Sequence, residues 1–276
     1  MTGHAAYERL LADIRPLKSV VVAFSGGVDS TLLLDACLQA LGTEQVLAVT
    51  LAPPYVPAVE IEEARRLARS LGARHNVVSV PFLDALHANP VERCYLCKRH
   101  LLGLLQTRAG HHGLAWVVEG SNSDDLGDHR PGMRAVRELE VISPLLAAGL
   151  DKAAVRIMSR QRSLDTWDKP AQACLLTRFP HGVTITSARL QRVERAEDVL
   201  RRLGFDAARV REHEGLARIE VPAEHIPDLV RVGLENDMEQ ALRNLGYAFV
   251  TVDLAGYRRG SFNSLVERNF RIGEQE

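Results

Sequence analysis

Two of the four cysteines in this chain of 276 residues stand one helical turn apart, in "VERCYLCKRHLL". Cys94 and Cys97 form a C-x₂-C pair, and Cys174 follows later in "AQACLLTR". Thiolates in this spacing bind iron or zinc, or form a redox pair. We expect these three cysteines to carry chemistry. Lys98 comes directly after the pair and is either a cation that stabilises a nearby thiolate or an ordinary exposed lysine.

The residue pattern leaves several kinds of cysteine site open. A structural zinc site needs four ligands, so that His100 or His181 would have to complete it. A thioredoxin-like redox pair needs only Cys94 and Cys97, and incidental thiols need no partner. The fourth cysteine, Cys37, lies in the apolar helical pattern "LLLDACLQAL", where we expect it to behave as a small core residue.

The segment "SGGVDS", residues 25–30, indicates a phosphate-binding loop. It follows a β-branched run and opens a helical pattern, so its amides and the helix dipole favour an oxyanion. Glycines let the backbone approach the ligand, and hydroxyls add donors. Asp29 is either a carboxylate favoured in a first helical turn or a contact to metal or substrate. The candidate phosphate-binding residues are Ser25, Gly26, Gly27, Asp29, Ser30 and Thr31.

A second polar segment, "EGSNSDDLGDHRPG", follows the predicted strand "LAWVVEG". It places Asp124, Asp125 and Asp128 just after the carboxyl end of that strand, where open α/β sheets bind ligands. Carboxylate oxygens there are suitable Mg²⁺ ligands. The alternative is a solvated turn whose side chains bond to the local backbone.

The elements that must position these residues alternate between strand and helix as far as about residue 180. This alternation predicts an α/β fold with a parallel sheet covered on both faces. The predicted strands lie near residues 19–24, 46–50, 76–80, "LAWVVEG" and 141–143, and the predicted helices follow "SGGVDS" and span about 57–71 and 98–109.

Beyond residue 180 the pattern changes to that of a small α+β domain. An amphipathic helix, "SARLQRVERAEDVLRRLGF", precedes two strands around a Glu-Gly turn, two more helices and the strand "AFVTVDL". We predict two domains, residues 1–178 and 179–276, with a connector at 168–182. The second domain is expected to serve in substrate binding or oligomerisation.

The composition favours a globular protein that acts on a small molecule. Hydrophobic residues make up 46% of the chain, and the net charge is −1, which gives no global signature of a nucleic-acid binder. No apolar run approaches the roughly 18 residues of a membrane span. We expect a cytoplasmic protein without a membrane or nucleic-acid partner. Lysine occurs only at positions 18, 98, 152 and 169.

Several motifs resemble a known family. "SGGVDS" is similar to the pyrophosphate loop (PP loop) of the ATP pyrophosphatases, whose shared step is attack of a substrate oxygen on the α-phosphorus of ATP. "GSNSDDLGDHRPG", "PAQACLLTRFPHG" and "VDLAGYRRGSFN" resemble the LarE family, sulfur transferases that help to build the nickel-pincer nucleotide cofactor. This resemblance spans nearly the whole chain.

The resemblance implies a fold, a reaction and cofactors. The fold would be the Rossmann-like, adenine nucleotide alpha hydrolase-like sheet of the PP-loop enzymes. ATP and Mg²⁺ would serve to adenylate the carboxylates of a pyridinium dicarboxylate mononucleotide, and sulfur would then convert them to thiocarboxylates. Relatives assemble as oligomers, so a homo-oligomer is expected.

The same resemblance implies a role for the cysteines. One branch of the family sacrifices the sulfur of a cysteine that corresponds to Cys174, but a single-use cysteine needs no C-x₂-C pair beside it. The present chain resembles the second branch, in which three cysteines, here Cys94, Cys97 and Cys174, hold a [4Fe–4S] cluster. Such a cluster leaves one iron open to sulfide from an external donor.

Two arginines match positions of the family's substrate or phosphate contacts. Arg211 lies in "ARVREHEG" and Arg258 in "GYRRG", where the neighbouring Arg259 is a possible substitute. A guanidinium fork binds phosphate and carboxylate in a bidentate fashion. The alternative for each is an ordinary surface arginine.

Three rival functions remain open at this point. A tRNA thiolase would also combine a PP loop with paired cysteines, although it should bind tRNA in a salt-dependent way. Another PP-loop synthetase would use ammonia and survive loss of the cysteines. A non-catalytic sensor would bind ATP or AMP without releasing pyrophosphate.

Overall fold

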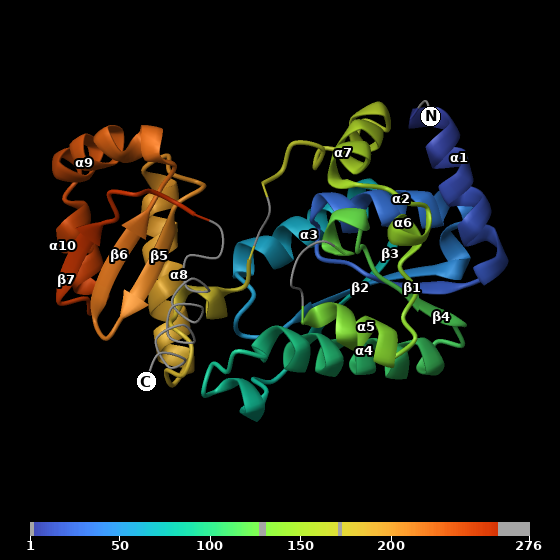
Figure 1. Cartoon of the computed structure of the whole chain (residues 1–276), viewed down its shortest axis with the longest axis horizontal. Coiled ribbons are helices and arrows are strands. Elements are labelled where there is room, and N and C mark those ends of the chain that lie inside the picture. The colour runs from blue at the N-terminus through green and yellow to red at the C-terminus, as the bar shows by residue number, and fades with distance from the viewer. Residues whose placement is uncertain (1–2, 127–130, 171–172, 259–276) are drawn as a thin grey trace, which may run out of the picture. The chain divides into compact units, whose positions relative to one another are not determined.

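The computed structural model describes residues 3–126, 131–170 and 173–258 and divides into two compact units (Figure 1). The first unit comprises residues 1–83 and 92–172, and the second comprises 84–91 and 173–276. The chain thus leaves the first unit after Leu83, contributes one short segment to the second, and returns at Glu92. The functional division predicted at 178/179 stays a prediction.

A parallel four-stranded sheet forms the centre of the first unit, which confirms the predicted α/β class. Its order is β3-β2-β1-β4. The strand predicted at 141–143 is present only as an isolated parallel bridge between Val118 and Ile142. The strands are β1 (Val20–Ala23), β2 (Val46–Ala52), β3 (Arg74–Ser79) and β4 (Trp116–Val118).

Helices cover both faces of this sheet (Figure 1). Successive residues of β1 point to opposite faces, so that Val20 and Val22 pack under α1, α2 and α7 while Val21 packs against α4 and α5. The helices are α1 (Gly3–Ile14), α2 (Val28–Leu41), α3 (Ala58–Ser70), α4 (Arg93–His111), α5 (Gly132–Glu138), α6 (Pro144–Ala147) and α7 (Lys152–Gln161).

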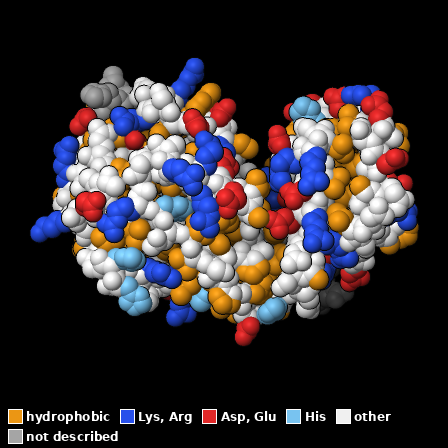
Figure 2. Space-filling view, turned by 180° about the vertical axis from the view of Figure 1, so that it is seen from behind, with side chains coloured by type: hydrophobic (Ala, Val, Ile, Leu, Met, Phe, Trp, Pro, Cys, Tyr) orange, Lys and Arg blue, Asp and Glu red, His pale blue; other side chains and the backbone are white. Residues whose placement is uncertain are grey.

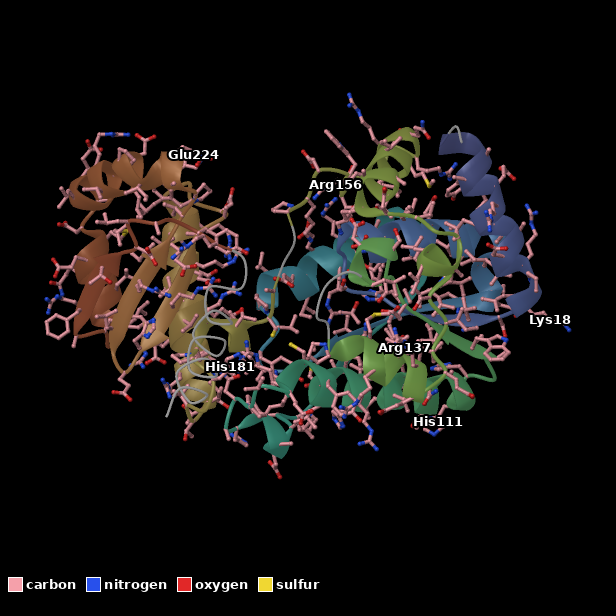
Figure 3. All side chains as sticks on the ribbon, viewed as in Figure 1. Lys18, His111, Arg137, Arg156, His181 and Glu224 are labelled. Atoms are coloured by element: carbon pink, nitrogen blue, oxygen red, sulfur yellow. The ribbon has the colours of Figure 1, made fainter. Side chains whose placement is uncertain are left out.

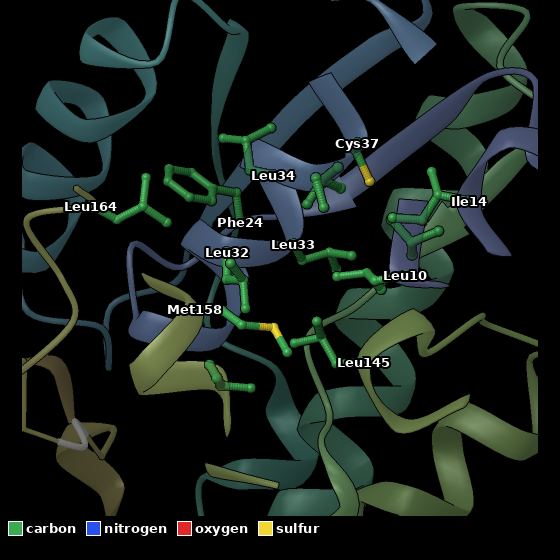
Figure 4. Close-up of a cluster of buried hydrophobic side chains, with 14 of the residues drawn as sticks. Leu10, Ile14, Phe24, Leu32, Leu33, Leu34, Cys37, Leu145, Met158 and Leu164 are labelled. Carbon is green, nitrogen blue, oxygen red and sulfur yellow. The ribbon is translucent and has the colours of Figure 1, made fainter. Parts of the chain in front are cut away.

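Cys37 lies inside the larger core cluster, between α2 and its neighbours (Figure 4). Its side chain is fully buried among leucines and isoleucine, and burial raises the pKa of its thiol. The structure therefore confirms that Cys37 packs as a core residue and separates it from the other three cysteines.

Helix α4 differs from the predicted helix at its start. The prediction placed the helix from about residue 98, whereas α4 already begins at Arg93 and includes both Cys94 and Cys97. The apolar periodicity used for the prediction is weak in this first turn, because the cysteines and charged residues interrupt it. Helices α1, α5, α6 and α7 were not predicted.

The second unit is the expected small α+β fold. Its sheet has the order β5-β6-β7, with β5 antiparallel and β7 parallel to β6. Glu214 and Gly215 both have positive φ, of 48° and 94°, as a two-residue hairpin turn requires. The elements are α8 (Ser187–Arg202), β5 (Arg209–His213), β6 (Leu216–Glu220), α9 (Ile226–Glu235), α10 (Met238–Asn244) and β7 (Phe249–Val252).

Charged side chains of both signs are intermixed over the face of the units shown in Figure 2. This distribution agrees with the balanced net charge of −1. Within the described residues, no helix is long and apolar enough to cross a membrane.

Candidate functional site

The PP loop, residues 25–30, connects β1 to α2. Hydrogen bonds of its serine hydroxyls stabilise its conformation. The Ser30 hydroxyl donates to the carbonyl of Gly27 at 3.2 Å and accepts from the Ser25 amide at 3.3 Å. The two serine hydroxyls are 3.1 Å apart. These bonds shape the loop while the first-turn amides of α2 remain available for an anion. Thr31 is buried, and its Oγ1 has no hydrogen-bond partner among the described residues.

Gly26 must be glycine because of both its conformation and its neighbours. Its φ is +68°, and a Cβ there would lie 3.2 Å from the Cα of Ala64 in α3. Only a residue without a side chain adopts this conformation freely and lets the loop pack against the helix. Close packing of Gly26 against Ala64 therefore holds the PP loop against α3.

Asp29, in the first turn of α2, is held by two groups from distant parts of the chain. Its Oδ1 accepts from Asn122 Nδ2 at 3.0 Å, and its Oδ2 pairs with the ammonium of Lys152. The adjacent loop comes so close that a Cβ on Gly120 would lie 3.1 Å from the Ser30 amide nitrogen. The sequence singled out Asp29 but not Asn122, Gly120 or Lys152.

The described part of the predicted Mg²⁺-binding segment, residues 119–126, will be called the acidic loop. Asp125 is buried and its Oδ2 accepts from the Asn122 amide at 3.1 Å, a local backbone bond of the kind that stabilises turns. Asp124 is exposed, and its Oδ2 accepts from the Lys152 amide at 3.2 Å. Magnesium binding by either carboxylate stays a prediction. Asp128 lies outside the described residues.

Lys98 reaches from α4 to the start of the acidic loop. Its ammonium lies 2.9 Å from Oε2 of Glu119, a buried carboxylate that also accepts from Ser121 and Ser143. Burial alone would raise the pKa of Glu119, but the charge of Lys98 and these hydrogen bonds outweigh it and lower the pKa. A Cβ on Gly132 would lie 3.0 Å from Lys98 Cδ. The lysine thus has a carboxylate partner that the sequence did not indicate.

Cys94 is the second residue of α4 and Cys97 is the fifth, so that the two thiols lie one turn apart at the start of this helix. Cys94 is exposed, whereas Cys97 is half-buried with its Sγ 3.1 Å from the hydroxyl of Tyr55. Tyr95, between them, is buried and donates to Oε2 of Glu138 at 2.7 Å. This hydrogen bond links the start of α4, which contains the two cysteines, to α5.

Cys174 belongs to the second unit, where it precedes the 3₁₀ helix η5 (Leu175–Arg178). It is half-buried, and its carbonyl accepts from the amide and the hydroxyl of Thr177. Arg178 is almost fully buried, donates to the carbonyl of Ala173 at 2.8 Å and pairs with Glu197 of α8. The backbone around Cys174 is therefore well anchored within its own unit.

Arg211 also lies in the second unit and is buried. It pairs with Glu220 across the β5–β6 hairpin and donates to the carbonyl of Thr177 at 2.8 Å. These bonds link the strand to η5, and a substrate contact stays a prediction. Arg258 is exposed at the end of the described residues, and Arg259 lies outside them.

Lys169 fixes the PP loop from the segment that leads out of α7. Its ammonium donates to the carbonyl of Gly26 at 2.9 Å and pairs with Glu63 of α3 at 2.6 Å. Arg156, labelled in Figure 3, donates to the carbonyls of Trp167 and Lys169 and so orders this segment.

Cysteine thiols are the groups of the chain that suit zinc or an iron–sulfur cluster. Across the described ranges, no three or more His, Cys, Asp or Glu side chains are grouped as a metal site. The donor chemistry nevertheless suits an iron–sulfur cluster, because two thiols one turn apart at a helix start match the spacing of cluster ligands. The zinc alternatives, His100 in α4 and His181 in the second unit, are both half-buried.

Three relatives align with most of this chain. An uncharacterized protein of Synechocystis sp. is 41% identical over 254 residues, which is 91% of this chain and 94% of the relative. A pyridinium-3,5-bisthiocarboxylic acid mononucleotide synthase of Lactiplantibacillus plantarum is 36% identical over 262 residues, 94% of each chain. An uncharacterized protein of Methanocaldococcus jannaschii is 30% identical over 87% of this chain and 91% of the relative. The family model described as NAD synthase matches residues 10–93, which include the PP loop.

Proposed function

Because this chain belongs to the LarE family of ATP-dependent, adenylating sulfur transferases, we propose that it converts a pyridinium dicarboxylate mononucleotide to the corresponding thiocarboxylate. The product would be a precursor of the nickel-pincer nucleotide cofactor. The name of the Lactiplantibacillus plantarum relative supports this substrate class.

One observation supports adenylation of the substrate. The PP loop leads directly into the first turn of α2, and the acidic loop lies beside the amides of that turn. A carboxylate oxygen is a poor leaving group, whereas AMP is a good one. Attack of the substrate carboxylate on the α-phosphorus of ATP forms an acyl adenylate, and pyrophosphate departs. We propose that the first-turn amides of α2 bind that pyrophosphate, with Ser25, Ser30 and Thr31 as further loop residues of the site, and that Mg²⁺ near Asp124 or Asp125 would neutralise its charge.

We further propose that Cys94, Cys97 and Cys174 carry the sulfur chemistry as ligands of a [4Fe–4S] cluster. When bound by three protein thiolates, such a cluster supplies one open iron for exogenous sulfide. The proposal is supported by the position of Cys94 and Cys97, which lie one turn apart at the start of α4, and by the Tyr55 hydroxyl, which lies 3.1 Å from the Cys97 sulfur. A separate sulfide donor would restore the sulfur after each turnover.

Arg211 and Arg258 are proposed to bind the phosphate or carboxylates of the substrate, since a guanidinium fork suits both groups. Lys98 is proposed to act near the cysteines or the substrate charge. We also propose that the protein is a homo-oligomer and acts in the cytoplasm.

The test offers anaerobically purified protein ATP, Mg²⁺, the dicarboxylate mononucleotide and sulfide, and measures thiocarboxylate by mass spectrometry together with pyrophosphate. We expect both products from the wild type. The variants Cys94→Ala, Cys97→Ala and Cys174→Ala should each lose bound iron and thiocarboxylate formation. The matched control is Cys37→Ala, which removes a core thiol and should keep both.

Each rival function gives a different result in the same experiment. Copurifying tRNA whose retention falls steeply with salt would identify a tRNA thiolase. Amide formation from ammonia that survives loss of all three cysteines would identify another PP-loop synthetase. Nucleotide binding without pyrophosphate release would identify a sensor, and thiocarboxylate formed once per chain without iron would point to Cys174 as a consumed sulfur source.

A further inference from the structure

A hollow on the second unit contains three arginines of α8, and the proposed function uses none of them. Its volume is about 360 Å³, which lies within the usual range of small-molecule sites. Arg189, Arg192 and Arg195 line it together with the amide side chains of Gln191 and Asn244. Among the described residues, no carboxylate lines this hollow. It therefore presents positive charge to small solutes.

The hollow is distinct from the surroundings of Arg211. Successive residues of β5 point to opposite faces of the hairpin, so that Arg211 and Glu212 lie on opposite sides of it. Glu212 is fully buried, and its carboxylate pairs with Arg189 at 2.7 Å and with Arg192 at 3.0 Å. Arg211 instead pairs with Glu220. The arginines of the hollow therefore form a separate group from the predicted substrate contact.

One carboxylate cannot neutralise three guanidinium groups. Glu212 compensates one of the two positive charges of Arg189 and Arg192. Arg195 is exposed and has no ion pair among the residues that the structure describes. Three positive charges and one negative charge thus leave two positive charges uncompensated at the hollow.

The stability of α8 does not account for these arginines. The helix begins at Ser187, directly after its cap Thr186, so that Arg189 lies in the first turn, where the dipole disfavours a cation. Arg189, Arg192 and Arg195 follow one another at intervals of three residues, and side chains at this spacing are neighbours on a helix surface. Their like charges therefore repel one another.

Two of the guanidinium groups are held in place by other parts of the second unit. Arg189 donates to the carbonyl of Thr184, and its guanidinium carbon lies 5.1 Å from the centre of the Phe179 ring. The guanidinium carbon of Arg192 lies 5.0 Å from the centre of the Tyr247 ring. The buried Nε of Arg192 has no hydrogen-bond partner within the described ranges. Guanidinium groups fixed in this way lose little side-chain entropy when they bind an anion.

We propose that Arg189, Arg192 and Arg195 form an anion-binding site, apart from the PP loop, that takes a phosphate dianion. The ligand is either free phosphate or the phosphomonoester group of a small metabolite. Two uncompensated positive charges match the charge of the dianion, and guanidinium groups bind phosphate oxygens in a bidentate fashion. Binding at this site requires neither ATP nor the substrate of the proposed reaction.

The experiment follows the Nε–H signals of the three arginines by NMR in protein labelled with ¹⁵N-arginine. Inorganic phosphate or AMP is added, and sodium chloride at matched ionic strength is the control. The signals are assigned from the variants Arg189→Lys, Arg192→Lys and Arg195→Gln, so that anion binding at the PP loop is not mistaken for binding at the hollow. We expect all three signals to shift in a saturable way with phosphate but not with chloride.

Arg195→Gln should weaken phosphate binding by about 10-fold or more, the size of one charge-assisted hydrogen bond. The matched control is Arg231→Gln, which removes an exposed arginine of α9 outside the hollow and should bind phosphate as the wild type does. Both variants remove one positive charge from the second unit, so a difference between them does not reflect net charge.

The two phosphate probes identify the source of the ligand. Equal affinities for inorganic phosphate and AMP would indicate free phosphate, and tighter binding of AMP would indicate a phosphomonoester; both results support the site. Chloride shifts as large as the phosphate shifts would overturn the inference, because they would reflect screening alone. Unchanged phosphate affinity in Arg195→Gln would overturn it as well. Arg195 is exposed, so this variant should fold, and the wild-type titration needs no variant to show binding.

Discussion

Three lysines neutralise three acidic side chains around the PP loop, and in each pair the partners come from distant parts of the chain. The pairs are Lys98 with Glu119, Lys152 with Asp29, and Lys169 with Glu63. The loop residues themselves could be predicted, because "SGGVDS" is a local pattern at a strand-to-helix junction. Glu119 and Glu63 could not, since nothing near them in the sequence indicates which lysine they meet.

Glu119 should make the stability of the protein depend on pH. Its pKa is lowered in the folded state by Lys98 and by hydroxyl donors that outweigh its burial, whereas an unfolded glutamate titrates near about 4.3. The stabilisation is therefore fully present above that pH and is lost as the pH falls through the lower folded value. Urea unfolding should show Glu119→Gln less stable than wild type at pH 7, with the difference shrinking below about pH 4.3.

The control for this measurement is Glu62→Gln, which removes an exposed carboxylate that pairs with Arg65 at the surface. It should follow the wild type across the whole pH range within about 0.5 kcal/mol. A difference between Glu119→Gln and wild type that stays constant down to pH 3 would contradict the assigned cause.

At the scale of the elements, the candidate site depends on the close approach of the acidic loop to the first turn of α2. A Cβ on Gly120 would lie 3.1 Å from the Ser30 amide nitrogen and 3.2 Å from the Asp29 carbonyl carbon, and backbone atoms cannot easily move aside. Gly120→Ala should therefore lower the free energy of unfolding by about 1 to 3 kcal/mol and weaken nucleotide binding. Chemical denaturation and calorimetry with ATP measure the two effects.

Gly103→Ala provides a matched control. Gly103 lies inside α4, and among the described residues outside the helix's own backbone no atom lies within 4 Å of its added Cβ, so alanine should raise stability by about 0.5 to 1 kcal/mol. Its nucleotide affinity should equal that of the wild type. If both alanine variants behaved alike, the contact at Gly120 would not be the cause.

Strands were easier to predict than helix ends. The β-branched runs of β1 and β2 are buried on both faces, which makes them visible as apolar segments. The start of α4 was placed too late because Cys94 and Cys97 interrupt its apolar pattern. Helix α7 carried a usable signal that was missed, since Asp151 is a typical capping residue before "KAAVRIM".

At the scale of the whole molecule, the sequence suggested two consecutive domains, whereas the compact units interleave along the chain. Residues 84–91 pack in the second unit through Asn89, which is fully buried with a φ of +43°. Its side-chain amide donates to the carbonyls of Phe179 and Pro180 at 3.2 and 2.8 Å. A pattern of local periodicity cannot reveal such a long-range exchange.

Asn89→Ala should destabilise the second unit by about 2 to 3 kcal/mol, because buried carbonyls lose their donor and alanine tolerates positive φ poorly. Urea unfolding and proteolysis within residues 84–91 measure the effect. Asn244→Ala, an exposed change at the end of α10, should stay within about 0.5 kcal/mol of wild type. Equal stability of the two variants would show that Asn89 does not secure this segment.

The interleaved path of the chain has a consequence for its synthesis. His87 and Asn89 accept backbone hydrogen bonds from Ile185 and Gly182, so residues 84–91 cannot reach their native partners until the ribosome has made and released that later segment. At about 5 to 20 residues per second, this delay is on the order of ten seconds. During this time residues 84–91, which precede Cys94 and Cys97 in the chain, lack their hydrogen bonds to Gly182 and Ile185. Cys94 and Cys97 are therefore synthesised before the second unit can form.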